Sequence, residues 1–312
     1  MNNNSGRWKG HAAMLVANVV WGAMSPVTKD LLLSETITPA ALSAIRIAGG
    51  AALFWLFTLI LPARMIPSEK IDRADWPMII LASVLMISAN QGLFILGIGY
   101  TSPIDSSVMS ALTPVITMVL AALLIHQPIT MLKAVGVILG LGGAVIMVLA
   151  NATGSAIASN PMLGDSLCLA AQFCAALYYV KFVNIIKRYS PFTMMKWMFT
   201  FASLTYVPCI MPWVLEVDFR TLPTKIWFEL AYIICLATFL AYLLIPYSQR
   251  YLRPTVIAMY NYLQPAAAAL LATILGVSAF GPLKIFATAM IFAGVWFVTR
   301  SKGSTPVNEE AD

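Results

Sequence analysis

Charged residues are scarce in this sequence. Only 10% of its 312 residues are Asp, Glu, Lys or Arg, whereas 60% are hydrophobic. A soluble domain carries about 25% charged and roughly 45–50% apolar residues. The composition excludes an ordinary soluble protein and indicates an integral membrane protein, surrounded by the lipid bilayer. The net charge of +6 does not indicate a nucleic-acid partner, because the basic residues lie in short gaps between apolar runs.

Cysteine, histidine and catalytic motifs are also scarce. The four cysteines lie within apolar segments, in no zinc-like spacing, and are interpreted as packed thiols. The sequence contains no HExxH motif, no nucleophile elbow and no carboxylate pair in the middle of an apolar run. We therefore expect neither an enzyme nor a cofactor or metal site. Long extramembrane loops are absent as well. Their absence disfavours a receptor or another non-transporting membrane partner, which is the alternative from a different functional class.

What the sequence does contain is a series of apolar runs long enough to cross a bilayer, which takes about 20 residues. Turn residues separate the runs, and proline opens several of them. Ten membrane-spanning helices are predicted, at approximately 11–33, 39–61, 77–100, 103–125, 130–150, 162–186, 191–215, 227–248, 254–276 and 281–300. Twelve lysines and arginines lie in one set of alternate loops and three in the other, so both termini are predicted to be cytoplasmic.

The two halves of the chain contain an internal repeat. A constant offset of 151 residues places Pro103 over Pro254, Pro114 over Pro265 and Gly143 over Gly294. An ungapped match of this length indicates a true repeat. Because each repeat has five helices, an odd number, the second copy enters the membrane from the opposite side. The predicted fold is all-α and integral to the membrane, with ten transmembrane helices as two inverted-topology five-helix repeats, at residues 11–150 and 162–300. Such inverted repeats are typical of secondary transporters, which bind substrate near the midplane between the halves.

Four segments of the chain have a recognisable pattern: "NVVWGAMSPVTK", "TPAALSAIR", "ALTPVITMVLAALL" and "YLQPAAAALLATIL". With them the chain resembles the drug/metabolite transporter superfamily, specifically its EamA-type branch. The resemblance covers residues 11–300. It implies a bacterial cytoplasmic (inner) membrane carrier that exports small metabolites or amino acids by alternating access. The chain departs from the family at Gln127 and Ser278, where a loop glutamate is common.

Polar side chains recur on single faces of several predicted helices. Within a bilayer such groups usually face a bundle interior or a cavity. The side chains interpreted as lining a substrate cavity are Asn18, Trp21, Ser25, Lys29, Asn90, Gln91, Thr113, Gln172, Tyr179, Asn261 and Gln264. Packing between helices is the alternative for each of them. Pro114 and Pro265 are interpreted as paired hinges, because proline frees a carbonyl one turn back and bends its helix.

Arg46 lies near the middle of its predicted helix, whereas Lys29 and Lys181 lie closer to helix ends. A lysine near an end can extend its amine to the interface, but Arg46 needs a carboxylate, backbone carbonyls or a bound anion. A structural tether and an anion contact both remain open for Arg46. A sugar-phosphate or nucleotide-sugar exchanger of the same superfamily is the alternative within transport, and it requires these three basic residues to converge. Proton coupling and exchange both remain open, and the sequence does not indicate an oligomeric state.

Overall fold

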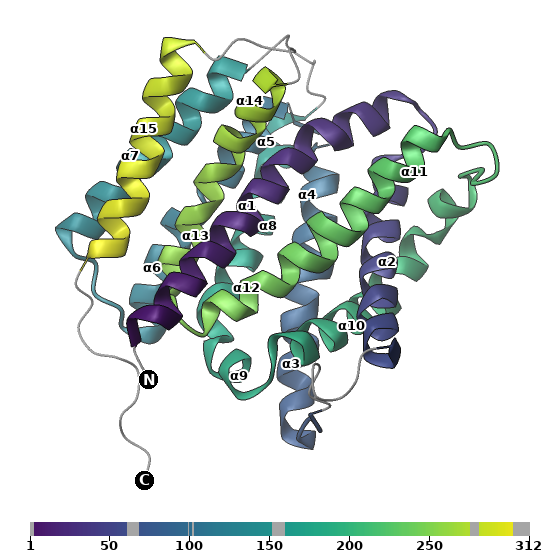
Figure 1. Ribbon diagram of the computed structural model, residues 1–312, viewed down its shortest axis with the longest axis horizontal. Coiled ribbons are helices and arrows are strands. Elements are labelled where there is room, and N and C mark those ends of the chain that lie inside the picture. Colours follow the sequence, from purple (N-terminus) through teal and green to yellow (C-terminus); the bar gives the residue numbers. More distant parts are fainter. Residues whose placement is uncertain are drawn as a thin grey trace.

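Helices form nearly all of the chain in the computed structural model, which describes residues 3–60, 69–98, 100–101, 103–151, 160–274 and 281–301. Within these ranges there is no β-strand (Figure 1). Eight helices of the described chain are long and apolar enough to cross a membrane. The predicted all-α membrane fold is therefore confirmed.

The first repeat contains the elements up to residue 151. They are α1 (Asn3–Leu33), α2 (Pro39–Ile60), η1 (Arg73–Asp75), α3 (Trp76–Ser83), η2 (Val84–Ala89), α4 (Asn90–Ile98), α5 (Pro103–Ala111), α6 (Thr113–Ile125) and α7 (Met131–Asn151). The second repeat follows with α8 (Pro161–Lys181), α9 (Val183–Arg188), α10 (Pro191–Leu215), α11 (Thr224–Ala231), η3 (Tyr232–Leu240), α12 (Ala241–Gln249), α13 (Pro254–Met259), η4 (Tyr260–Tyr262), α14 (Leu263–Ile274) and α15 (Pro282–Arg300).

The eight candidate spans agree with eight of the ten predicted crossings. The other two correspond to α1, which has 31 residues, and to the interrupted helix α13–η4–α14. The third and eighth crossings each contain a π-helical segment, η2 and η3. A π-helical turn inside an α-helix often marks a functional position.

The contact between α7 and α15 shows how the repeats are related, and the two helices lie side by side in Figure 1. A Cβ added to Gly143 would lie 2.7 Å from the carbonyl oxygen of Ala287. A Cβ added to Gly294 would lie 2.6 Å from the carbonyl oxygen of Gly136. The offset of 151 converts the first pair into the second, because 143 + 151 = 294 and 136 + 151 = 287. Each contact is thus a copy of the other, as expected where matched helices cross on a pseudo-two-fold axis.

The same symmetry relates the other contacts between the repeats. The first helix of one repeat, α1, packs against α12 and α14 of the other. Its counterpart α8 packs against α4 and α6. Each repeat therefore supplies its first helix to the opposite half, and the polar residues of α1 and α8 lie at the interface between the repeats.

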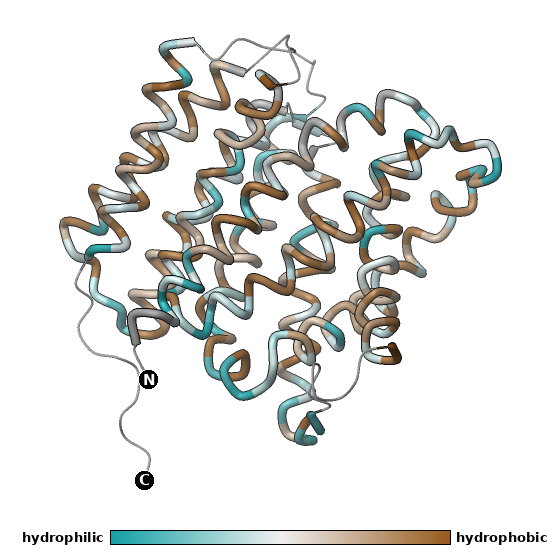
Figure 2. Tube along the Cα trace, viewed as in Figure 1, coloured by the Kyte–Doolittle hydropathy of each residue, from teal (hydrophilic) through white to brown (hydrophobic). Residues whose placement is uncertain are grey.

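Residues along the helices are mostly apolar, and polar residues gather toward the helix ends and loops, as Figure 2 shows. Leu59, Met131 and Leu215 are 80%, 81% and 78% exposed. Exposed apolar residues in such number suit lipid contact. The interpretation of all four cysteines as packed thiols is wrong for Cys209 and Cys235, which are exposed. A membrane protein has apolar side chains both inside and outside, so an apolar sequence context does not show that a thiol is packed.

Candidate functional site: a polar interface between the repeats

Two matched hydrogen bonds join the repeats near the middle of the predicted membrane crossings. Gln264 Nε2 of α14 donates to Asn18 Oδ1 of α1 at 3.0 Å. Thr113 Oγ1 of α6 donates to Gln172 Oε1 of α8 at 2.9 Å. Asn18 and Gln172 are equivalent in the repeat at an offset of 154, and Thr113 and Gln264 at an offset of 151. The same pair of positions is therefore bonded twice, once on each side of the pseudo-two-fold axis.

Both bonds lie beside an interruption of the helix that carries the donor. Helix α6 begins at Thr113, directly after a break at Leu112, and Pro114 is in its first turn. The equivalent break is η4, which ends at Tyr262, and Pro265 follows in α14. Proline removes a backbone donor, so a break at these positions follows from the sequence. The hinge role of the two prolines stays a prediction.

Helix α1 meets α14 closely at the first of these bonds. A Cβ added to Gly22 would lie 2.6 Å from the Gln264 carbonyl oxygen and 2.6 Å from Ala267 Cβ. Glycine lets the two backbones touch here, because any larger residue must displace one of them. Asn18, one turn earlier, is fully buried and also donates from Nδ2 to the Met14 carbonyl oxygen at 2.9 Å.

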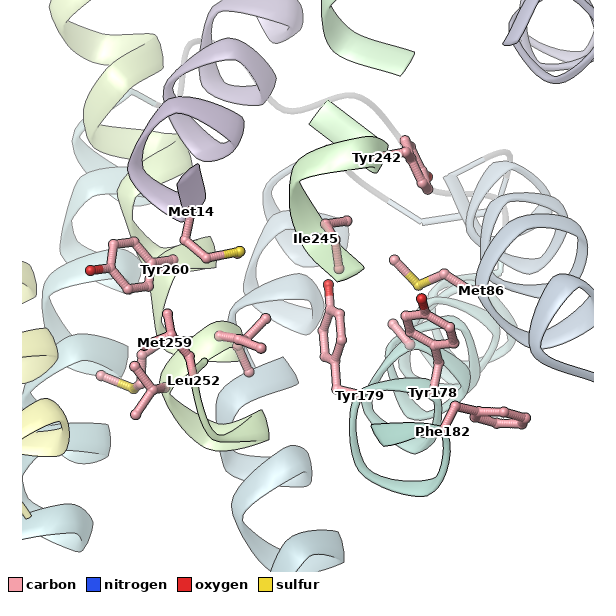
Figure 3. Packing of buried hydrophobic residues seen from close by; sticks show 14 of the residues in the cluster. Met14, Met86, Tyr178, Tyr179, Phe182, Tyr242, Ile245, Leu252, Met259 and Tyr260 are labelled. Atoms are coloured by element: carbon pink, nitrogen blue, oxygen red, sulfur yellow. The ribbon is translucent and has the colours of Figure 1, made fainter. Parts of the chain in front are cut away.

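A group of tyrosines lies at the centre of the core. Gln91 Nε2 donates to the Tyr242 hydroxyl at 3.3 Å, and the Trp21 ring meets the Tyr242 ring edge-on at 5.4 Å. Figure 3 shows Tyr178 and Tyr179 side by side, with the Tyr179 hydroxyl directed toward Ile245 and the Tyr178 hydroxyl toward Met86. The Tyr179 hydroxyl also interacts with the side chain of Asn261, and Asn261 Oδ1 lies 3.5 Å from Gln264 Nε2.

Two buried polar atoms in this region have no hydrogen-bond partner among the described residues, namely Gln91 Oε1 and the Tyr178 hydroxyl oxygen. A buried polar atom left without a partner costs about 1–3 kcal/mol. Water or a ligand is the usual partner for such an atom. The centre of the interface is therefore polar and incompletely satisfied by the protein itself.

Arg46 of α2 reaches the same region from the other side. Its Nε donates to Thr238 Oγ1 at 3.2 Å, and its charge lies close enough to Tyr242 to interact with it. Thr238 and Ala237 belong to the π-helical segment η3. The Ala237 carbonyl oxygen accepts a hydrogen bond of 2.7 Å from Trp21 Nε1. The π-helical segment thus receives a donor from α1 and a donor from α2.

The structure brings together most of the side chains predicted to line the cavity. Asn18, Gln264 and Asn261 form one group, Thr113 and Gln172 form the matched group, and Trp21, Gln91 and Tyr179 border the tyrosines.

One other predicted residue, Asn90, falls outside these groups. Asn90 donates from Nδ2 to the Ala171 carbonyl oxygen at 2.8 Å, a contact that joins α4 to α8. The side chains of Ser25 and Lys29 lie outside the described part of the structure. Lys181 is exposed at the end of α8, so it does not converge with Arg46 inside the bundle.

Sequence reasoning missed Tyr242 and Thr238, because both stand in an apolar run that reads as ordinary packing. The repeat itself contains the signal for Tyr242. Gln91 and Tyr242 are 151 residues apart, so they occupy the same position in the two repeats. A residue on a pseudo-two-fold axis meets its own copy, and applying the offset to the third helix would have paired these two.

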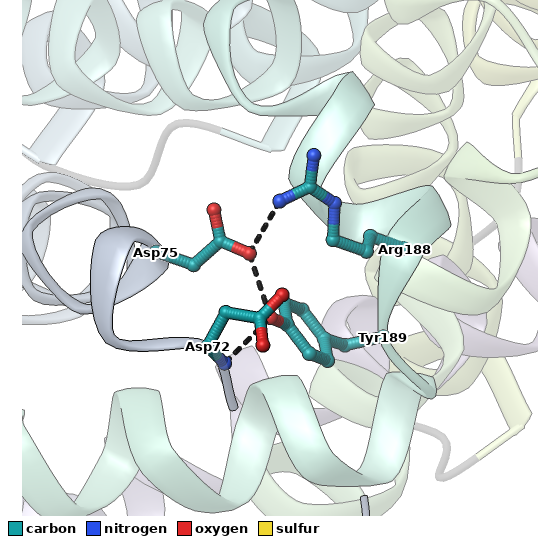
Figure 4. A network of polar contacts seen from close by, with 4 residues as sticks. All are labelled: Asp72, Asp75, Arg188 and Tyr189. Carbon is teal, nitrogen blue, oxygen red and sulfur yellow. Dashed lines mark hydrogen bonds and ion pairs between the residues drawn. The ribbon is translucent and has the colours of Figure 1, made fainter. Parts of the chain in front are cut away.

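Ion clusters also join the repeats at the two ends of the bundle. The Asp75 cluster, which includes Asp72, Arg188 and Tyr189, lies at the start of α3 (Figure 4). Arg188 Nη1 and the Tyr189 hydroxyl each lie 2.6 Å from Asp75 Oδ2, and the Asp72 backbone N–H donates to the Tyr189 hydroxyl at 3.0 Å. Burial and the bond to Asp75 raise the pKa of Tyr189, so its hydroxyl keeps the proton it donates.

The Asp30 cluster lies at the opposite end of the bundle, where α1 ends and α11 begins (Figure 1). Lys225 Nζ forms an ion pair with Asp30 and lies 3.8 Å from Glu229 Oε1. Each cluster joins the third helix of one repeat to the segment that ends the first helix of the other. The two clusters are therefore copies in position, although their residues differ.

Comparison with known proteins assigns the family. The profile of the EamA-like transporter family matches residues 8–149 and, a second time, residues 162–300. This chain belongs to the EamA-like transporter family. The family resemblance expected from the four sequence segments is confirmed, and the chain is a multi-pass membrane protein of a transporter family.

Individual relatives are distant. An uncharacterized transporter of Bacillus subtilis (strain 168), YyaM, is 20% identical over 53% of this chain and 54% of its own length. An uncharacterized transporter of Archaeoglobus fulgidus is 24% identical over 51% of this chain and 52% of its own length. The chain thus spans about half the length of these curated relatives. A solved structure described only as a protein has a TM-score of 0.77 and 17% identity, over 96% of this chain and 98% of that one. This likeness shows a common fold.

Proposed function

We propose that the protein is a secondary-active transporter that exports small metabolites or amino acids across the bacterial cytoplasmic membrane by alternating access. In this proposal residues 11–150 and 162–300 are the two five-helix repeats, both termini are cytoplasmic, and the substrate binds between the repeats. Membership of a transporter family supports the general class.

The proposal rests on the two matched hydrogen bonds, one between Gln264 and Asn18 and the other between Thr113 and Gln172. Alternating access requires two related arrangements of the repeats around one site. A polar contact that occurs twice, in equivalent positions, lets one copy loosen while the other stays formed. The helix breaks before Pro114 and Pro265 supply places where α6 and α14 bend.

The two ion clusters suit the same mechanism. The Asp75 cluster would close the cytoplasmic end, and the Asp30 cluster would close the outer end. Opening either end would break one cluster and leave the other formed. Ion pairs near the membrane surface are weak individually, which suits contacts that must form and break in each transport cycle.

A sugar-phosphate or nucleotide-sugar exchanger receives less support. Recognition of a phosphate usually needs several lysine or arginine side chains around it. Of the three basic residues considered for this role, Lys181 is exposed, and Arg46 alone is described inside the bundle.

The test is efflux from proteoliposomes that contain the purified protein and a panel of amino acids and small metabolites. Gln264→Leu and Asn261→Leu are expected to lower the efflux rate about tenfold or more, because they remove the amides that meet the substrate. Leu270→Ala is the matched control, since Leu270 is 52% exposed on the same helix. An imposed pH gradient and an excess of substrate on the far side distinguish proton coupling from exchange.

Equal efflux for wild type and both amide variants, at equal protein level, would overturn the assignment of the site. Absence of efflux for every compound, with protein that is folded and correctly inserted, would overturn the export function.

A further inference from the structure

We propose that Arg46, together with Tyr242 and Gln91, forms a binding site for a carboxylate group of the transported molecule. The inference rests on the proposed transport function and names one chemical group of its substrate. It follows from the surroundings of Arg46, from the unsatisfied polar atoms beside it and from its counterpart in the other repeat.

Arg46 lacks a counter-ion in the part of the chain whose side chains are described. Its Nε bond to the neutral Thr238 hydroxyl is the one hydrogen bond it makes there, and neither terminal nitrogen has an acceptor among the described residues. Burial desolvates the guanidinium, yet the side chain keeps an intermediate exposed fraction. Such a charge requires an anion or water to offset the cost of desolvation.

The groups around Arg46 complement a carboxylate. The Tyr242 hydroxyl accepts a hydrogen bond from Gln91 Nε2, so its own proton is left to donate. The planar guanidinium offers two parallel N–H donors in the geometry that a carboxylate prefers. Gln91 Oε1 and the Tyr178 hydroxyl, both buried and without partners, are available to a donor group elsewhere on the same ligand.

The other repeat shows that packing does not require a charge at this position. The offsets of 152 and 151 convert the contact of Arg46 with Thr238 into the pair Met198 and Ile87. Both counterparts are apolar and 0% exposed. The fold therefore accommodates an apolar pair at the matched position, and a buried ion is generally no more stabilising than well-packed apolar residues. The charge of Arg46 therefore serves binding rather than holding the helices together.

The experiment compares ligands that differ only in the carboxylate, using the full chain purified in detergent. Thermal unfolding is followed while leucine and leucinamide, then benzoate and benzamide, are titrated at constant chloride concentration. The two pairs separate an amino acid from a simple carboxylic acid as the source of the carboxylate. Wild type is expected to be stabilised by at least one of the two carboxylates, and its amide is expected to have no effect.

Three substitutions then test Arg46. Arg46→Met copies the counterpart residue and is expected to fold while losing the response to the carboxylate. Arg46→Gln is expected to weaken binding about tenfold or more, and Arg46→Lys less, because lysine keeps the charge without the planar pair of donors. Lys196→Gln is the control, since Lys196 is a second buried basic residue and lies over the Trp55 ring.

Equal stabilisation by carboxylate and amide, an unchanged response in Arg46→Gln, or a response that chloride alone reproduces would overturn the site. Failure of all three Arg46 variants to fold would also overturn it, by showing a structural tether. These outcomes are separate from the transport test. Carboxylate binding without efflux would contradict the export function alone, whereas efflux without a carboxylate preference would contradict the site alone.

Discussion

The contact between α1 and α14 and the contact between α8 and α6 are copies of one another, built from different side chains. At the first, two amides meet, Gln264 and Asn18. At the second, the hydroxyl of Thr113 meets the amide of Gln172. The repeat thus keeps the position of a polar pair while changing its chemistry, so the two sides of the interface are not equivalent for a substrate that binds between them.

The two contacts differ in packing as well. Gly22 of α1 lies against the backbone of α14, and the equivalent position in α8 is Ala176, which is fully buried. The absence of a side chain at Gly22 makes the α1–α14 contact the less tolerant of added volume. We therefore expect changes at α1–α14 to have larger effects than matched changes at α8–α6.

The largest effect is expected from Gly22→Ala. The new methyl group would lie 2.6 Å from the Gln264 carbonyl oxygen, so α1 and α14 must separate. Overpacking of this kind costs about 1–3 kcal/mol. Thermal unfolding in detergent is expected to show a lower melting temperature, and proteoliposomes are expected to show reduced efflux. The matched control Ala176→Gly adds no volume and is expected to cost about 1 kcal/mol or less. A larger loss in the control than in Gly22→Ala would reverse the comparison.

A smaller effect is expected from the two hydrogen bonds themselves. Hydrogen bonds between membrane helices contribute about 0.6 kcal/mol on average and about 1.7 kcal/mol at most. Double-mutant cycles with Asn18→Leu and Gln264→Leu, and with Gln172→Leu and Thr113→Val, measure each coupling energy from the free energy of unfolding. The cycle isolates the bond from the other effects of each substitution.

We expect the Asn18–Gln264 coupling to be the stronger one, because Gly22 holds the two helices close at that bond, whereas the Thr113 hydroxyl also donates to the Ser110 carbonyl oxygen at 2.6 Å. Equal couplings would show that the difference in packing does not change the strength of the polar contact.

Most features predicted from the sequence depend on neighbouring residues, whereas the features that were missed depend on contacts between residues far apart along the chain. Apolar runs indicate the membrane crossings. The matched residues Pro114 and Pro265 indicate where two helices are interrupted, since proline acts on its own helix. The contact between Asn18 and Gln264 could also be anticipated from the sequence, because both residues are polar in apolar surroundings. Tyr242 was missed because an aromatic residue in an apolar run gives no sign of whether it faces the core or a site.

The Asp75 cluster was missed for another reason. Asp75 and Arg188 are 113 residues apart, and each looks like an ordinary charge at a helix end. Their contact depends on how the first helix of one repeat lies against the third helix of the other. Only the exchange of helices between repeats, which the tertiary structure shows, brings them together.

The smallest effect is expected from breaking the ion clusters at the two ends of the bundle. Arg188→Gln breaks the ion pair with Asp75, and Lys225→Gln breaks the pair with Asp30. If each cluster closes one end, the first substitution favours the form open to the cytoplasm and the second favours the form open outward. The side chains of Arg188 and Lys225 are 59% and 68% exposed, so each substitution is expected to shift the populations modestly and leave the melting temperature nearly unchanged.

The shift is measured by the labelling rate of Ala268→Cys, on α14, with a membrane-impermeant maleimide added to right-side-out and inside-out vesicles. The four native cysteines are replaced first, because Cys209 and Cys235 are exposed. Lys187→Gln and Arg220→Gln are the matched controls, since each removes one exposed positive charge that lies close in sequence to Arg188 or Lys225 and forms no ion pair with the described residues. Labelling that rises from opposite sides in Arg188→Gln and Lys225→Gln is the expected result. Because the two clusters are copies in position, a change from the same side in both variants would show that at most one of them closes an end of the transport pathway.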